Sequence, residues 1–129
     1  MSDRFSFSIR LPARPSSVGI TRSVIRSLDS VVHGEPLERA ELVMSEIVTN
    51  AIRHGSRGGR DDIGVEITAD SHQLSAAVSD SGPEFEPPPT IRGTEQIGGF
   101  GLHIAMTLAD LAITHTPAGN TVRFAIPYD

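Results

Sequence analysis

The run from Ser45 to Gly55 constrains this chain more than any other stretch, because it has the pattern of the last turns of an amphipathic helix. Glu46 and Asn50 lie four residues apart on one side of such a helix, and His54 continues that line by one turn. A carboxylate and an amide at the edge of a core either hydrogen-bond to a neighbouring strand or belong to a metal or phosphate site. Short motifs often occur by chance, so the run alone favours the first explanation. The apolar residues that mark the buried side are Leu42, Val43, Ile47, Val48, Ala51 and Ile52.

Composition narrows the possible functions. The chain has 129 residues, 38% of them hydrophobic, which fits a single domain spanning residues 1–129. Its net charge of −5 argues against a nucleic-acid binder, which needs a basic face. All 11 basic residues are arginines, so a bound phosphate has to be held by backbone N–H groups, arginine or a metal rather than by lysine.

The chain also lacks several common signals. It contains no cysteine, which excludes disulfides, thiolate catalysis and cysteine-based zinc sites. The N-terminus alternates polar and apolar residues without the apolar segment of a signal peptide, and no apolar run approaches the length of a membrane span. We therefore expect a cytoplasmic protein with no membrane partner.

Hydrophobic periodicity predicts the elements of one α+β domain. The first strand, with apolar residues from Phe5 to Leu11, is followed by a helix capped by Ser16-Ser17 and ended by Gly34. The order β-α-α-β-β-α-β-β predicts a two-layer sandwich, with helices on one face of a mostly antiparallel, mixed sheet. The predicted helices are 18–33, 37–54 and 102–111, and the later strands are 63–69, 73–79, 112–116 and 121–126.

Residues 81–97 form a long loop rich in proline and glycine, without periodicity. A loop of this length in a small domain is usually functional or disordered. It separates two short motifs, one at 80–82 and one at 98–101.

Glu46 and Asn50, the two polar residues of this predicted helix, have a chemical interpretation. The side-chain carbonyl of Asn50 is a good ligand for Mg²⁺, a hard ion that keeps several waters and binds few protein groups. The carboxylate of Glu46, one turn away, can orient or deprotonate a water or a hydroxyl.

The segment Asp80-Ser81-Gly82 ends a predicted strand. The Asp80 carboxylate can accept a hydrogen bond from the amino group of adenine, and Gly82, which lacks a Cβ, lets a flat base approach the backbone. The alternative is an ordinary turn, since Asp, Ser, Gly and Pro are common turn residues.

The glycines Gly98, Gly99 and Gly101 precede the third predicted helix. Exposed N–H groups at a helix N-terminus bind anions without lysine. The alternative is a hinge or a close helix contact. A Rossmann interpretation fails, because no parallel βαβ unit surrounds these glycines.

Together the three motifs resemble the GHKL ATPase superfamily, which has the Bergerat fold, and most closely its anti-sigma-factor serine kinases. The resemblance covers nearly the whole chain, from the first strand to Pro127. The segment 44–55 is similar to the family's N box, and Asp80-Ser81-Gly82-Pro83 and Gly99-Phe100-Gly101-Leu102 are similar to its two glycine boxes. Gly119-Asn120-Thr121-Val122 is similar to the closing segment, where a threonine helps to hold the adenine-binding aspartate.

The resemblance implies an ATP site between the N-box helix and the loop at about 83–98, which serves as a lid. It implies that Asn50 holds Mg²⁺ across the phosphates and that Glu46 is the general base. Asp80 and Gly82 then bind adenine, assisted by Thr121 through water. The residues implied to surround the phosphates are Gly99, Gly101 and Leu102, with Arg92 as the lid's candidate phosphate ligand.

The resemblance also implies partners. The family phosphorylates a serine or threonine of a small STAS-domain antagonist, sequesters a sigma factor, and often forms homodimers through the first strand and helix. Two alternatives stay open. One is a regulatory module that binds ATP without kinase turnover. The other is a stand-alone histidine-kinase-type ATPase domain, which is disfavoured because no phosphoacceptor helix pair precedes the motifs.

The sequence departs from the family pattern in the loop. Glu84 stands where a second glycine is common, although Phe85 matches. The lid is short, contains Pro87-Pro88-Pro89 and has no lysine. These departures concern lid closure and turnover, and they leave the adenine and Mg²⁺ positions unchanged.

Overall fold

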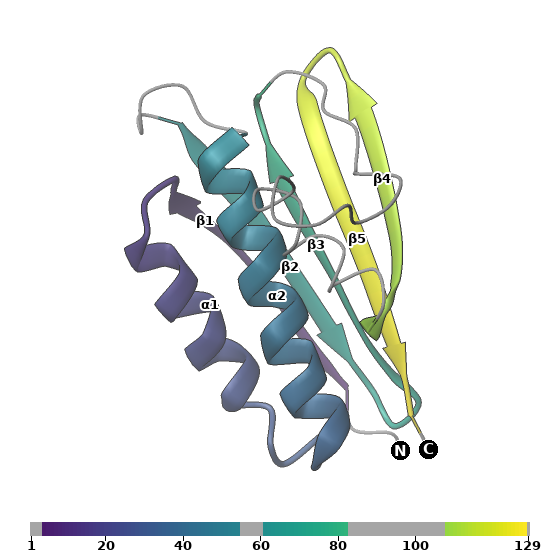
Figure 1. Ribbon diagram of the computed structural model, residues 1–129. Coiled ribbons are helices and arrows are strands. Elements are labelled where there is room, and N and C mark those ends of the chain that lie inside the picture. Colours follow the sequence, from purple (N-terminus) through teal and green to yellow (C-terminus); the bar gives the residue numbers. More distant parts are fainter. Residues whose placement is uncertain (1–3, 55–60, 83–107, 129) are drawn as a thin grey trace, which may run out of the picture.

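The computed structural model describes residues 4–54, 61–82 and 108–128 of the chain. Two helices and five strands lie in these segments (Figure 1). The predicted lid and second glycine box fall outside them. The elements are β1 Phe5–Pro12, α1 Ser16–Arg26, α2 Glu35–His54, β2 Asp62–Ala69, β3 Gln73–Asp80, β4 Asp110–Thr116 and β5 Gly119–Pro127.

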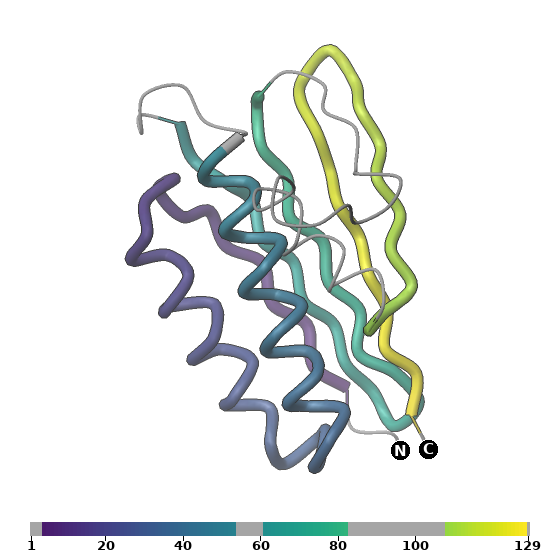
Figure 2. Tube along the Cα trace, viewed as in Figure 1, coloured from purple at the N-terminus to yellow at the C-terminus, as the bar shows by residue number. Residues whose placement is uncertain are grey.

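The five strands form one sheet in the order β1-β2-β3-β5-β4, and each neighbouring pair is antiparallel. Both helices cover the same face of this sheet (Figure 1). The predicted α+β sandwich is therefore confirmed, and the described strands contain no parallel pair. The start of β1 and the end of β5 lie at one end of the sheet, and the β4–β5 turn lies at the other (Figure 2).

The core lies between the helices and the sheet, because apolar residues recur at every second strand position. In β2 the side chains of Ile63, Val65 and Ile67 are almost fully buried, whereas Glu66 and Thr68 on the other face are exposed. Helix α2 contributes the opposite wall of the core with Ala40, Val43, Met44, Ile47, Val48 and Ala51.

The first helix ends earlier than the sequence predicts. It stops at Arg26, where the hydroxyl of Ser27 donates to the carbonyl oxygen of Val24 at 2.6 Å and competes with further helical bonding. The turns that follow still bury Leu28 and Val32. The helix predicted for 18–33 is therefore too long, because its last apolar residues keep a helical spacing although they lie in turns.

The predicted serine cap of this helix is also wrong. Pro15 occupies the cap position, and no side chain caps the helix. The hydroxyl of Ser17 instead donates to the carbonyl oxygen of Pro12 at 2.6 Å, which fixes the corner between β1 and α1.

The third predicted helix, 102–111, extends too far. Asp110 and Leu111 belong to β4 and pair with Ala125 and Phe124 of β5. Strand pairing overrides the local helical pattern at these two positions, and Leu111 also packs against the core.

An ion-pair cluster joins the two helices on their outer side. The Glu41 carboxylate of α2 lies 2.7 Å from Nη2 of Arg26 and 3.1 Å from Nε of Arg22, both on α1. The hydrogen bond from Arg26 is the main reason that the pKa of Glu41 lies below its usual value.

Neither described helix is long and apolar enough to cross a membrane.

Candidate functional site

The site residues predicted on α2 and β3 occur at the same end of the molecule. Helix α2 runs toward the end of the sheet where β3 finishes and β5 begins (Figure 1). Glu46 and Asn50 lie in the second half of α2, and both are partly buried. The fold therefore brings the N-box residues toward Asp80, which ends β3.

Asp80 is a buried carboxylate with defined partners. Its side chain is only 8% exposed. Its Oδ1 accepts hydrogen bonds from the backbone N–H of Gly82 at 2.8 Å and from Nδ2 of Asn120 at 3.0 Å. Burying a carboxylate is costly unless hydrogen bonds compensate, so this arrangement is a specific feature of the site.

The second carboxylate oxygen of Asp80 has a different environment. Within the described segments, no hydrogen-bond donor is assigned to Oδ2. An acceptor oxygen held on a buried carboxylate suits the exocyclic amino group of adenine, which is a donor. This acceptor oxygen thus fits an adenine nucleotide.

Asn120 is the site residue that the sequence analysis missed. It is 1% exposed, faces Asp80 across the β3–β5 pair, and its Oδ1 lies 2.9 Å from Nδ1 of His115. The signal that could have identified it is the register of the last strand, which brings position 120 opposite Asp80.

Thr121, which the family resemblance implies assists Asp80, lies one position further along β5. Its Oγ1 is 3.1 Å from Oγ of Ser79, its partner in the β3–β5 register. Because neighbouring residues of a strand point to opposite faces, this pair lies on the face opposite Asp80. The direct contact with Asp80 comes from Asn120 instead.

The remaining predicted residues divide into two groups. Glu46 borders a shallow depression on the outer side of α2 that also includes Leu42, Ser45 and Arg22 of α1. No cluster of three acidic or histidine side chains that could hold a metal occurs within 4–54, 61–82 and 108–128. Arg92, Gly99, Gly101, Leu102 and the lid lie outside the described residues.

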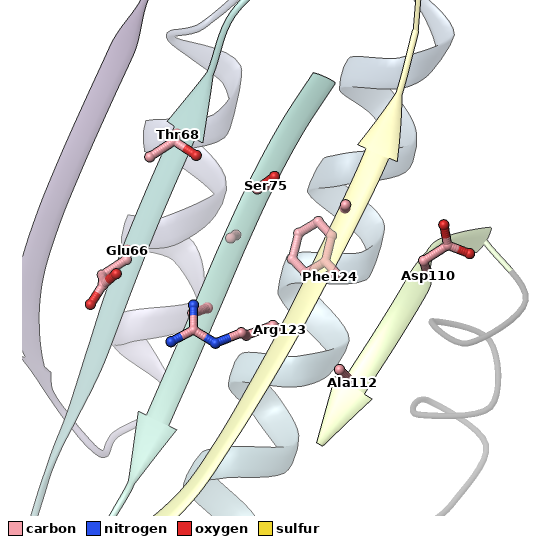
Figure 3. Close-up of a pocket in the computed structure, with 10 residues that line it drawn as sticks. Glu66, Thr68, Ser75, Asp110, Ala112, Arg123 and Phe124 are labelled. Atoms are coloured by element: carbon pink, nitrogen blue, oxygen red, sulfur yellow. The ribbon is translucent and has the colours of Figure 1, made fainter. Parts of the chain in front are cut away.

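A separate hollow lies on the sheet face away from the helices (Figure 3). The polar residues that line it are Glu66 and Thr68 of β2, Ser75 of β3, Arg123 of β5 and Asp110 of β4, and the rest of the lining is Phe124 and alanines. Of the predicted site residues that lie in the described segments, none borders it. The hollow is therefore distinct from the end of the sheet that holds Asp80.

Comparison with known protein families matches residues 11–126 to the Histidine kinase-like ATPase domain. The chain belongs to this family. The match spans both α2, with Glu46 and Asn50, and the Asp80–Asn120 pair. The family match thereby confirms the ATP-binding GHKL fold that the motifs predict.

Individual relatives of this ATPase domain agree. The serine-protein kinase RsbW of Bacillus pumilus is 29% identical over 130 residues, covering 88% of this chain and 80% of the relative. RsbW of Listeria monocytogenes is 31% identical over 117 residues, covering 80% and 74% respectively. The name of these relatives agrees with the predicted enzyme class, a protein serine/threonine kinase.

A solved structure supports the fold. The crystal structure of the RsbU and RsbW domains of a Mycobacterium tuberculosis protein matches with a TM-score of 0.68 at 22% identity. The match covers 94% of this chain and 32% of that longer chain. At this identity the likeness establishes the architecture alone.

Proposed function

We propose that this protein is an ATP- and Mg²⁺-dependent serine/threonine kinase that acts as an anti-sigma regulator. Its substrate is a STAS-domain antagonist, and its second partner is a sigma factor. The observation that carries the proposal is the buried Asp80 carboxylate, held through Oδ1 by Gly82 and Asn120 at the end of the sheet that α2 approaches.

In this proposal Asp80 selects the base. Oδ1 is occupied by two donors, which leaves Oδ2 as the acceptor for the adenine amino group. Gly82 is buried next to this carboxylate and has no Cβ to block a flat ring. Both features support adenine over a base that presents a carbonyl at the same position.

The phosphates need ligands other than lysine. The amide of Asn50 is partly buried on α2 and offers the neutral oxygen that Mg²⁺ accepts. Mg²⁺, when bound, neutralises negative charge on the phosphates. We assign the remaining phosphate contacts to the glycine box at Gly99, Gly101 and Leu102 and to Arg92 of the lid, residues 83–98.

Glu46 is the proposed general base. It lies one helical turn before Asn50, so the same side of α2 carries both groups. The substrate hydroxyl oxygen attacks the terminal phosphorus, the bond from that phosphorus to the oxygen of ADP breaks, and Glu46 takes the hydroxyl proton. No other residue of this proposal has to change protonation state.

Dimer formation through the first strand and helix is part of the proposal. Strand β1 is an edge strand of the sheet, and α1 lies next to it (Figure 1). An edge strand presents unpaired backbone groups that a second copy can cover. The protein is proposed to act in the cytoplasm, where sigma factors act.

Phosphoryl transfer is tested by incubating the protein with labelled Mg-ATP and candidate STAS-domain proteins. We expect label on a serine or threonine of one candidate. Glu46→Gln should retain ATP binding and lose at least a hundredfold in transfer rate, since general bases contribute about 10²–10⁴-fold. Glu66→Gln, on the opposite sheet face, is the matched control and should behave like wild type. Absence of label on every candidate, with ATP bound, would leave a regulatory module without turnover.

A further inference from the structure

His115 is linked to the adenine-binding carboxylate through one intermediate residue. Its Nδ1 lies 2.9 Å from Oδ1 of Asn120, and Nδ2 of Asn120 lies 3.0 Å from Oδ1 of Asp80. Asn120 Nδ2 also lies 3.4 Å from the carbonyl oxygen of Gly82. The register places the three side chains in one row across β4, β5 and β3.

The direction of these hydrogen bonds follows from chemistry. An ionised carboxylate only accepts, and so does a carbonyl, so the atom of Asn120 that faces Asp80 and Gly82 must be the amide nitrogen. The amide oxygen then faces His115 and can only accept. Nδ1 of His115 must therefore carry a proton and donate it.

We propose that His115, acting through Asn120, is a positioning residue that makes the site select purines with an amino group at position 6. The proposal rests on the proposed binding of ATP by Asp80 and deepens it. His115 fixes the orientation of the Asn120 amide, and Asn120 in turn keeps Oδ1 of Asp80 hydrogen-bonded. Asp80 is thereby held as an acceptor.

The preference for adenine over hypoxanthine follows from which atoms of the site donate and which accept. Adenine presents an N–H donor at position 6, whereas hypoxanthine presents a carbonyl acceptor there, which would face a carboxylate oxygen with no proton between them. A site built around a hydrogen bond rejects the analogue that cannot make it. When Asn120 no longer donates, one hydrogen bond to the Asp80 carboxylate is lost, and the carboxylate is no longer held in the orientation that suits the adenine amino group.

The burial of Asn120 and Asp80 favours a positioning role for these hydrogen bonds over a surface contact without consequence. Asn120 is 1% exposed and Asp80 is 8% exposed, so water does not readily replace the hydrogen bond that Asn120 donates to Asp80. His115 lies at the exposed end of the row, on β4. Replacing it therefore changes the hydrogen bond without opening the core.

The test compares binding of ATP and inosine triphosphate (ITP) to the full chain by isothermal titration calorimetry. Wild type should bind ATP at least tenfold more tightly than ITP. Asn120→Leu, which keeps the size and removes the donor, and His115→Phe, which keeps a ring and removes the N–H, should each reduce this ratio at least threefold. Thr116→Ala is the matched control, because the Thr116 hydroxyl accepts from Ala118 in the same hairpin turn and does not enter the row.

The outcomes separate the two proposals. If wild type binds neither nucleotide, the proposed function fails. If wild type binds ATP selectively but His115→Phe and Asn120→Leu keep its ATP-to-ITP ratio, the positioning role is wrong while the proposed function stands. An equal fall in the ratio for Thr116→Ala would also contradict the role, because hairpin destabilisation would then explain the effect.

A second measurement does not depend on either variant folding. Long-range ¹H–¹⁵N NMR spectra of wild type report which ring nitrogen of His115 carries the proton in the neutral form. We expect the Nδ1–H tautomer, which is the minor one in free histidine. An Nε2–H tautomer would overturn the proposal, since Nδ1 would then have no proton to donate to Asn120.

Discussion

Gly119 and Asp80 are in direct backbone contact. A Cβ built on Gly119 would lie 1.8 Å from the carbonyl oxygen of Asp80, and Gly119 has a φ of +136°, which side-chain-bearing residues rarely adopt. The start of β5 therefore packs closely against the backbone of Asp80, the residue proposed to bind adenine. Only glycine allows this approach, so the glycine supports the site as well as the turn.

The first prediction follows from this contact. Gly119→Ala should lower the free energy of unfolding by about 2 kcal/mol or more, because both the backbone conformation and the contact oppose a methyl group. It should also weaken ATP binding by moving the hairpin away from Asp80. Thermal unfolding and calorimetry measure the two effects. Gly19→Ala is the control, since nothing lies within 4 Å of its Cβ position and alanine favours the helix.

The second prediction concerns the ion pairs between α1 and α2. Hydrogen bonding by Arg26 lowers the pKa of Glu41 below its ordinary value of 4.5. A lowered folded-state pKa stabilises the fold above the unfolded pKa, and the contribution is lost as pH falls through the folded pKa. Wild type should thus be more stable than Glu41→Gln at pH 7, and the difference should shrink as the pH falls through the lowered folded-state pKa of Glu41.

The size of this effect should be small. The Arg26 side chain is 61% exposed, and solvent screens exposed pairs, so we expect a melting-temperature difference of about 5 °C or less. Glu38→Gln on the same helix is a useful comparison, because within the described segments no ion pair joins Glu38 to an arginine. A pH-independent difference between wild type and Glu41→Gln would contradict the assigned cause.

The third prediction distinguishes Thr121 from Asn120. Thr121→Val removes the hydroxyl that lies 3.1 Å from Oγ of Ser79 but keeps the β-branched shape that suits β5. We expect ATP affinity to change less than threefold, whereas Asn120→Leu should reduce it about tenfold or more. Calorimetric titration with ATP compares the two variants. A larger loss for Thr121→Val would favour the water-mediated role that the family resemblance implies.

Much of the fold could be predicted from periodicity alone. Alternating residues such as Val65 and Ile67 marked strands, and the helical spacing of Val43 and Ile47 marked the buried side of α2. The end of α1 could not be predicted, because Leu28 and Val32 keep a helical spacing while the hydroxyl of Ser27 ends the helix. Local hydrogen bonds of this kind do not appear in a hydrophobic pattern.

The site was only partly predictable for a related reason. Asp80 and Gly82 could be identified because they adjoin in sequence and form a recognisable motif. Asn120 could not, since its contact with Asp80 joins residues 40 positions apart and depends on the exact β3–β5 register. His115 is a further step removed, because it contacts Asp80 only through Asn120.

The most direct test of the account is the thermal shift that Mg-ATP produces in wild type and in Asp80→Ala. A ligand at 100 times its Kd adds about 2.7 kcal/mol of stability, which for a domain of this size raises the melting temperature by several degrees. We predict this shift for wild type and none for Asp80→Ala. Equal shifts in both folded proteins, or no shift in wild type, would contradict the claim that Asp80 binds the adenine of ATP.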